Sequence, residues 1–289
     1  MTTASSAQNK LDFLWLELTN RCNLQCVHCY TESHPHSVDR DLLNTSDYES
    51  IVLQAYALGC RKIQFIGGEP QLNRDFLRLL AKAKEINFEF IEVFSNLTKL
   101  SEDTLEFSSA NNIFFATSVY SDEPSEHDAI TGVNSSHTNT IKNLRRLIDK
   151  GIQARAGIVV INQSEDAVER TKKFLADLGV THVDVSNARA FGRGEKILSQ
   201  EACLSSLCGN CWNRKLCIAP DGVAYPCVMA RHWPVGSVLK SSLQEIVQGE
   251  LLEEMRGTIF EEVWMTKFSA SRLELDNKGD PAGSPLQAM

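Results

Sequence analysis

The sequence lacks several features that would place it in common protein classes. No stretch offers the roughly 20 consecutive apolar residues that a membrane-spanning helix needs. Residues 1–9 are polar and lack the apolar core of a secretory signal. Basic residues are in deficit, with 29 Lys and Arg against 37 Asp and Glu, so the net charge is −8. This balance argues against a general nucleic-acid binder, which needs a basic face. We therefore predict a cytoplasmic protein with no membrane and no nucleic-acid partner.

Cysteine, in contrast, is abundant in the sequence. Nine cysteines occur among 289 residues. Three lie within residues 22–29, five within residues 203–227, and Cys60 stands alone. Because the cytosol keeps thiols reduced, the two groups suggest metal binding rather than disulfides. Cys60 is interpreted as a small buried apolar residue.

The region between the two cysteine groups alternates short apolar runs with amphipathic helical patterns, which predicts an α/β fold with a parallel sheet. Six units are too few for a full eight-unit barrel, which typically takes about 250 residues. We predict a partial (β/α)6 TIM-like barrel over residues 11–195, with an open doubly wound sheet as the alternative. In either fold the site lies at the carboxyl ends of the strands. The predicted strands are residues 13–19, 62–66, 89–94, 113–119, 153–161 and 182–185.

The strand–helix pattern stops after the last predicted strand. Residues 191–194 (FGRG) predict a linker. Residues 200–240 are rich in cysteine and poor in helical pattern, as expected of a small module organised by metal. Residues 241–289 form a third part, with one short helix predicted at 243–255 and a disordered polar tail from residue 276.

The first cysteine group has the spacing C-x3-C-x2-C, from Cys22 through Cys26 to Cys29. Three thiolates leave one iron of a four-iron cluster without a protein ligand, and that iron is open to a substrate or cosubstrate. A zinc site is the alternative, with His28 or His34 as the fourth ligand, although structural zinc sites favour two separate C-x2-C pairs. The spacing alone does not distinguish an iron–sulfur cluster from a zinc site.

A second motif makes the first one specific. The cysteines follow the first predicted strand, within Leu-Thr-Asn-Arg-Cys-Asn-Leu and ending in Cys-Tyr, and Gly-Gly-Glu-Pro at residues 67–70 follows the second. Residues 11–190 thereby resemble the radical S-adenosylmethionine (radical SAM) superfamily. The resemblance implies that Cys22, Cys26 and Cys29 hold a [4Fe-4S] cluster whose fourth iron chelates SAM. It implies reductive cleavage of SAM to a 5′-deoxyadenosyl radical, hydrogen abstraction from a substrate, and an electron donor such as flavodoxin or ferredoxin.

The resemblance also implies a set of SAM-binding residues. Gly67 and Gly68 carry no Cβ and would let the backbone approach the ligand. Glu69, or carbonyls near it, would receive the methionyl ammonium, and Pro70 stiffens the turn. The full set is His28, Gly67, Gly68, Glu69, Pro70, Asn96, Ser118 and Arg155.

Four members of this set are assigned by their position relative to the predicted strands. His28 stands where the family places an aromatic ring near adenine. Ser118, at the end of the fourth strand, would contact ribose or carboxylate, and Arg155 would pair with the methionyl carboxylate. Asn96 occupies the place of an Asn-Gly turn in which Leu97 replaces the glycine. Strand-end turns for Ser118 and Asn96, and an ordinary ion pair for Arg155, are the alternatives.

The second cysteine group also resembles a known domain. Residues 220–222 (PDG) predict a hairpin turn, and spacing alone suits zinc and iron–sulfur equally. The pattern Cys211-x10-Gly222-x4-Cys227, with residues 234–238 (PVGSV), resembles the SPASM/Twitch extension of radical SAM enzymes. It implies one auxiliary [4Fe-4S] cluster at most, because no cysteine follows Cys227. The implied ligands are Cys208, Cys211, Cys217 and Cys227, with Cys203 as a spare.

The substrate is the least readable feature. Residues 127–132 (HDAITG) with Ser136-His137 resemble the bacterial peptide-maturase branch, which implies a ribosomally made peptide that is cross-linked or epimerised. The alternatives are a small-molecule intermediate such as a sugar or nucleoside and, more remotely, a metal-binding regulator that is not an enzyme. Residues 1–10 are too few for a leader-binding domain, so a separate leader-peptide-binding protein is an expected partner. No catalytic acid or base is assigned; the loop residues that could face the substrate are Tyr120, Asp122, Glu123, His127 and Asp128.

Overall fold

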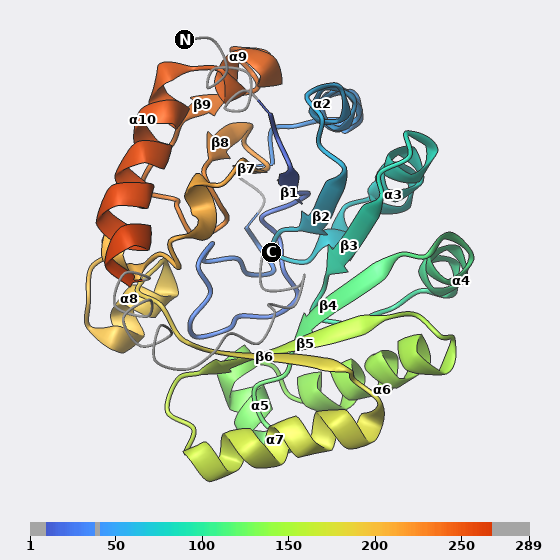
Figure 1. Ribbon diagram of the computed structural model, residues 1–289. Helices are drawn as coiled ribbons and strands as arrows, with labels where there is room; N and C mark the ends of the chain where they lie inside the picture. Colours follow the sequence, from blue (N-terminus) through green and yellow to red (C-terminus); the bar gives the residue numbers. More distant parts are fainter. Residues whose placement is uncertain (1–9, 38–40, 268–289) are drawn as a thin grey trace, which may run out of the picture.

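The computed structural model describes residues 10–37 and 41–267 and is an α/β fold built on one nine-stranded sheet (Figure 1). The strands are β1 (Phe13–Glu17), β2 (Lys62–Ile66), β3 (Phe90–Phe94), β4 (Phe114–Ser118), β5 (Ala154–Val160), β6 (His182–Asn187), β7 (Lys215–Ile218), β8 (Val223–Tyr225) and β9 (Gly236–Ser237). The α-helices are α2 (Thr45–Ala57), α3 (Phe76–Glu85), α4 (Glu102–Asn111), α5 (Pro124–Thr131), α6 (Ser136–Asp149), α7 (Glu165–Leu178), α8 (Arg193–Leu198), α9 (Leu243–Val247) and α10 (Glu250–Thr258). Short 3-10 turns occur at η1 (Pro70–Leu72), η2 (Leu204–Ser206) and η3 (Asn210–Trp212), and a π-helical segment at η4 (Ile259–Trp264).

The order of the strands identifies a partial barrel. The sheet runs β6-β5-β4-β3-β2-β1-β7-β8-β9, and β1 to β6 pair in parallel, each beside the next in sequence. Because crossovers between parallel strands are right-handed, this order puts every connecting helix on one face. A doubly wound sheet would instead reverse its strand order at a switch point. Figure 1 shows α2, α3, α4, α6 and α7 outside the curved sheet. The sheet does not close, since β6 and β9 are its two edges.

All six predicted strands are confirmed, and β2 has the predicted bounds. Alternation of side chains decides which face of each strand meets the helices. Leu14 and Leu16 of β1 are fully buried in the main core, together with Ile51 of α2 and Leu79 of α3. Trp15, between them in sequence, points to the other face and lines the barrel interior. The interpretation of Cys60 as a buried residue is also confirmed.

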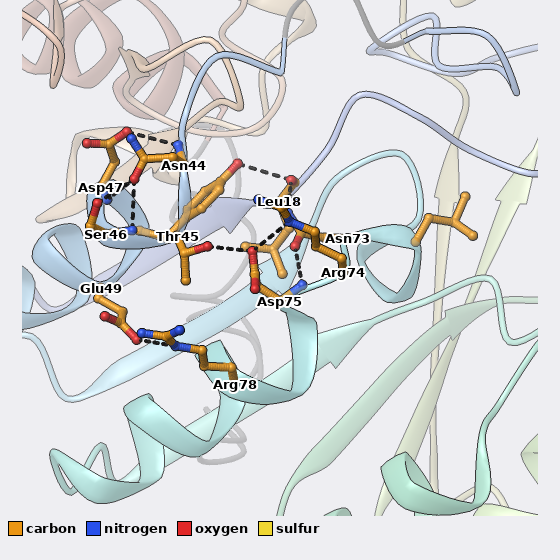
Figure 2. Close-up of polar contacts among 12 residues, drawn as sticks. Leu18, Asn44, Thr45, Ser46, Asp47, Glu49, Asn73, Arg74, Asp75 and Arg78 are labelled. Carbon is orange, nitrogen blue, oxygen red and sulfur yellow. Dashed lines mark hydrogen bonds and ion pairs between the residues drawn. The ribbon is translucent and has the colours of Figure 1, made fainter.

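The start of α2 and the start of α3 anchor the end of β1 (Figure 2). Thr45 donates a hydrogen bond to Asp75 at 2.5 Å, which joins the two helix starts. The amide of Asn73 donates to the carbonyl of Leu18 at 2.7 Å, and the buried hydroxyl of Tyr48 donates to the same carbonyl at 3.0 Å. The chain therefore leaves β1 toward the first cysteine group along a path set by both helices.

The region after β6 agrees with the predictions only in part. The predicted hairpin is confirmed, because β7 and β8 pair antiparallel across a turn that contains Gly222 at a φ of +79°. The predicted linker at 191–194 is wrong, since Phe191 is fully buried and α8 begins at Arg193. The single helix predicted at 243–255 is also wrong. Gly249 takes an extended conformation between α9 and α10 and serves as the N-cap of α10.

The tail predicted to be disordered from residue 276 lies outside the described residues. No helix in the described part of the chain is both long and apolar enough to cross a bilayer.

Candidate active site

The barrel encloses a cavity of about 350 Å³ at the carboxyl ends of its strands. Its size falls within the range of about 300–1,000 Å³ that is usual for ligand pockets. The strand-end rule therefore predicted the position of the site, because loops far apart in sequence meet there. The predicted site residues that line this cavity are Cys22, Cys26, Cys29, His28, Gly67, Gly68, Asn96, Ser118 and Arg155.

The three cysteines of the first group share this cavity. Cys22 is buried, and its sulfur accepts the backbone N–H of Leu24 at 3.4 Å and lies 3.7 Å from the side-chain amide of Asn96. Burial raises the pKa of the Cys26 thiol to about 12 and raises the pKa of Cys22 further. A cationic group bound between them would reverse this effect, because an opposite charge favours the thiolate that binds metal. The donor set therefore fits an iron–sulfur cluster.

Within residues 10–37 and 41–267, no group of three His, Cys, Asp or Glu side chains is placed to hold one metal ion.

Gly67 and Gly68 lie in the loop that follows β2, called the second loop below. The backbone beside this loop leaves no room for a Cβ at either position. A Cβ on Gly68 would lie 2.4 Å from the carbonyl oxygen of Arg21, and a Cβ on Gly67 would lie 2.6 Å from that of Thr19. The N–H of Gly68 donates to the Thr19 carbonyl at 2.8 Å, and that of Glu69 to the Arg21 carbonyl at 2.9 Å. The absence of Cβ thus lets the second loop pair directly with the chain that leads into Cys22.

Glu69 and Pro70 lie behind the cavity wall rather than in it. The buried carboxylate of Glu69 accepts hydrogen bonds from the Asn96 N–H at 2.8 Å and the Ser95 hydroxyl at 2.9 Å. It also accepts the N–H of Gln71 at 3.2 Å. Burial raises the pKa of Glu69 to about 7 despite these bonds. In this structure Glu69 joins the loops after β2 and β3, and its contact with SAM stays a prediction.

Leu97 adopts the backbone conformation that a glycine would favour at this position. Its φ is +55° although its side chain is fully buried. Two side chains of α6 hold the turn: Thr140 donates to the Asn96 carbonyl at 2.7 Å, and Asn143 donates to the Leu97 carbonyl at 2.8 Å. These bonds offset the steric cost of a left-handed leucine. The Asn-Leu loop thereby keeps Asn96 at the cavity.

One wall of the cavity is aromatic and polar. The ring of His28 packs edge-on against Tyr120 with centroids 5.1 Å apart, and its Nδ1 is buried without a partner. Burial and the nearby Arg193 lower the pKa of His28 to about 4, so the ring is neutral and able to stack. The hydroxyl of Tyr120 interacts with both Ser118 and Cys26. The orphaned nitrogen and the neutral ring fit an adenine-sized polar ligand.

Arg155 points into the cavity but is already paired. Its Nε and Nη2 donate to the two carboxylate oxygens of Glu92 at 2.8 and 2.9 Å, and its Nη1 lies 3.4 Å from Asp184. The amide of Gln64 donates to the same Glu92 carboxylate. The fork that was predicted to receive the methionyl carboxylate is therefore occupied by Glu92, and that pairing stays a prediction.

The loop after β4 divides into cavity residues and supporting residues. Tyr120 and His127 line the cavity. Asp128 instead accepts the N–H of His137 at 2.9 Å and holds the turn between α5 and α6. Asp122 interacts with Thr171 on the buried face of α7.

The carbonyls at the end of α5 also hold the first cysteine loop. Those of Ile130 and Thr131 accept the N–H groups of Val27 and Gln25, both at 2.9 Å. The segment 127–132 is thus joined to the cysteine loop by backbone hydrogen bonds.

The second cysteine group gathers next to the barrel. The sulfurs of Cys211 and Cys227 lie 2.7 Å apart. A hydrogen bond from Cys211 lowers the pKa of Cys208 to about 5, which favours the thiolate. Cys217 is fully buried in β7 and interacts electrostatically with Cys227. Cys203 stands apart, with hydroxyls of Ser205 and Ser206 at 3.1 and 3.2 Å.

A buried ion pair joins the barrel to this second group. Glu17, at the end of β1, pairs with Arg231 and accepts a hydrogen bond from the Tyr30 hydroxyl at 3.2 Å. Cys217 lies beside the same carboxylate. The chain that leaves Cys29 is therefore tied to the module that carries the second cysteines.

Several residues of the cavity wall were not predicted from the sequence. Trp15 and Gln64 face each other across the β1–β2 register, and a polar Gln64 inside the apolar run KIQFI was the available signal. Ser186, Asn187 and Arg189 line the cavity on the β6 side and carry no comparable local signal.

Comparison with known protein families agrees with this geometry. Residues 16–175 match the model of the radical SAM superfamily. Residues 208–273 match the SPASM model, described as an iron–sulfur cluster-binding domain.

Individual relatives are distant. The chain is 23% identical to the antilisterial bacteriocin subtilosin biosynthesis protein AlbA of Bacillus subtilis, over 83% of this chain and 60% of that protein. It is 26% identical to PqqA peptide cyclase of Granulibacter bethesdensis, over 67% of this chain and 51% of that protein. The chain thus spans between half and three fifths of these relatives.

Among solved structures, the fold is similar to that of Streptococcus suis SuiB bound to S-adenosylmethionine. The TM-score is 0.71 at 17% identity, over 86% of this chain and 68% of that one. SuiB bound to its precursor peptide SuiA aligns with a TM-score of 0.70 at the same identity, over 86% of this chain and 67% of that one.

Proposed function

Because this chain belongs to the radical SAM superfamily, whose members use a [4Fe-4S] cluster and SAM, we propose that it modifies a ribosomally made peptide by radical chemistry. The observation that carries the proposal is the single cavity that Cys22, Cys26 and Cys29 share with six of the eight SAM-binding residues proposed from the sequence, all except Glu69 and Pro70. The SPASM match adds an auxiliary iron–sulfur cluster in the second cysteine group.

When bound, the first cluster supplies the electron that cleaves the sulfonium C–S bond of SAM. The chain's own residues hold and orient the reactants. Cys22, Cys26 and Cys29 would hold the cluster, and the neutral ring of His28 would stack against the adenine. Ser118 would contact ribose or carboxylate from the end of β4. Enclosure by the barrel excludes water, and a fixed orientation of the reacting atoms lowers the barrier.

The peptide class of substrate is supported by the printed roles of the similar proteins. AlbA is a bacteriocin biosynthesis protein, PqqA peptide cyclase acts on a peptide, and SuiB has been solved with its precursor peptide. β6, whose Ser186 and Asn187 line the cavity, is an edge strand of the sheet. A long peptide would reach the cavity past this edge with one side chain. An electron donor protein and a separate leader-binding protein complete the proposal.

The test begins with anoxic reconstitution of the full chain and assay of iron, sulfide and zinc. Two four-iron clusters predict about eight irons per chain, falling to about four when Cys22, Cys26 and Cys29 are all replaced by alanine. Replacing Cys208, Cys211 and Cys227 serves as the matched control and should also leave about four. The first variant should lose formation of 5′-deoxyadenosine from SAM under dithionite. Stoichiometric zinc without iron would contradict the proposal.

The substrate class needs its own assay. Short peptides encoded beside the gene would be incubated with the holoenzyme and SAM, and examined by mass spectrometry and by chiral amino-acid analysis after hydrolysis. Loss of two hydrogens, or inversion at one residue without a change of mass, would support peptide modification. SAM cleavage that responds to sugars or nucleosides and to none of the peptides would contradict it.

A further inference from the structure

The segment 191–194, which looked like a linker in the sequence, is bound to the back of the cysteine loop (residues 22–34). The backbone N–H of Arg193 donates to the carbonyl of Cys29 at 3.0 Å. Its guanidinium reaches the same loop twice, with Nε on the Cys26 carbonyl at 2.8 Å and Nη2 on the Ser33 carbonyl at 2.9 Å. Three hydrogen bonds from one residue therefore span the cysteine loop.

The glycines on either side of Arg193 make this approach possible. A Cβ on Gly192 would lie 2.6 Å from the carbonyl oxygens of both Cys29 and Tyr30, and the φ of Gly192 is +54°. A Cβ on Gly194 would lie 2.1 Å from the carbonyl oxygen of Arg189. A side chain at Gly192 would push the segment away from the loop, and one at Gly194 would disrupt the turn that follows Arg189. The Gly-Arg-Gly sequence is thus suited to contact with this loop.

The guanidinium also places a charge beside the cysteines. Arginine stays protonated in proteins, so this charge is permanent. Its Nε lies 2.8 Å from the carbonyl oxygen of Cys26, so the charge stands next to the backbone of the cysteine loop that leads into His28. Both residues line the cavity. The charge therefore acts on the wall where the cluster and SAM are proposed to bind.

We propose that Arg193 is a positioning residue that closes the cysteine loop and supplies a fixed positive charge to its cluster. The inference rests on the proposed function, since it takes the loop to carry the SAM-binding cluster. Bonds to the loop carbonyls keep the thiols in place for the irons. The positive charge favours the reduced cluster, which carries one more negative charge, and so raises its midpoint potential.

Two substitutions separate the two roles. Arg193→Gln removes the charge and shortens the donor, whereas Arg193→Lys keeps the charge and loses the planar fork. Arg146→Gln is the matched control, because Arg146 also donates its guanidinium to a backbone carbonyl, that of Leu100 at 2.9 Å, away from the cysteines. Circular dichroism and thermal melting of each iron-free protein check the fold.

Three readouts are measured on the full chain. The first is the rate of iron loss to a chelator after reconstitution. The second is the midpoint potential of the cluster whose EPR signal responds to SAM. The third is the alkylation rate of Cys26 and Cys29 in iron-free protein, which needs no cluster. The expected result for Arg193→Gln is iron loss faster by on the order of 10-fold, the scale of other ligand-supporting substitutions. Its potential should be lower and its alkylation faster than in the parent.

Arg193→Lys should keep a potential near that of the parent and still lose iron faster. Parent-like iron loss, potential and alkylation in a folded Arg193→Gln protein would overturn the proposal. If that protein does not fold, parent-like iron loss and alkylation in Arg193→Lys would overturn it. If the variant that lacks Cys22, Cys26 and Cys29 holds as much iron as the parent, the proposed function is overturned instead. The alkylation rates would then still decide whether Arg193 holds the loop.

Discussion

Arg155 and Glu92 form a bidentate ion pair across the inner face of β3 and β5, with N–O distances of 2.8 and 2.9 Å. Glu92 is only 2% exposed. Removing one partner of a buried pair leaves the other charge uncompensated, so Glu92→Gln should lower the free energy of unfolding by about 3 kcal/mol. Urea denaturation of the iron-free, reduced protein measures this.

The double variant Glu92→Gln/Arg155→Gln is the control for this pair. It should be less destabilised than the sum of the two single variants, because no unpaired charge remains. Additive losses would mean that the two side chains do not depend on one another.

Glu69 predicts a pH dependence of stability. Its pKa is raised to about 7 by burial in the folded state, while an unfolded glutamate titrates near 4.3. Between these values the folded state holds a proton that the unfolded state has lost, so stability is present at low pH and lost as pH rises toward 7. Relative to Glu69→Gln, the parent should lose up to about 3 kcal/mol between pH 4.5 and 7.5. Denaturation at a series of pH values checks it, and parallel curves would refute the assignment.

The positive φ of Leu97 predicts that truncation to glycine destabilises the protein less than truncation to alanine. Leu97→Ala removes a fully buried side chain and should cost about 3 kcal/mol. Leu97→Gly removes the same side chain but relieves the positive φ, which costs a non-glycine residue about 1–2 kcal/mol. The glycine variant should therefore be the more stable of the two, whereas glycine is usually worse than alanine. The usual order in chemical denaturation would show that the turn is not strained.

Gly68 predicts a steric effect on iron retention. A Cβ at this position would lie 2.4 Å from the Arg21 carbonyl, so Gly68→Ala should separate the second loop from the cysteine loop. Reconstituted protein should then hold less iron at the first site. Gly257→Ala in α10 is the control, because nothing lies within 4 Å of its added Cβ and alanine favours a helix. Equal iron in both variants would contradict the close approach of the two loops.

Cys203 predicts a labelling pattern that tests its role as the spare cysteine. Hydrogen bonds from Ser205 and Ser206 lower the pKa of Cys203 to about 7, whereas burial raises that of Cys60 to about 12. Iodoacetamide at pH 7.5 should label Cys203 rapidly and Cys60 hardly at all, because the thiolate is the reactive form. Reconstitution with iron should leave the labelling of Cys203 unchanged. Slower labelling of Cys203 after reconstitution would instead indicate that Cys203 is a cluster ligand.

Several elements of the fold could be predicted because local patterns determine them. The six strands of the barrel, the turn at Gly222 and the C-x3-C-x2-C loop depend on residues adjacent in the chain. The strand-end rule then brought Cys22, Gly67, Asn96 and Ser118 to one edge of the sheet, where they do meet. The break at Gly249 escaped prediction because the apolar periodicity of residues 243–255 continues across it.

The sequence by itself therefore determined the class of the protein, the strand order that a right-handed parallel fold allows, and the cysteines that share the cavity. Only the tertiary structure decided which polar groups are free to act there. Arg155 is paired with a glutamate 63 residues away, and Arg193 reaches the Cys26 carbonyl across 167 residues. Hydrogen bonds of this range depend on how loops pack over the finished barrel, and no local pattern of residues encodes that packing.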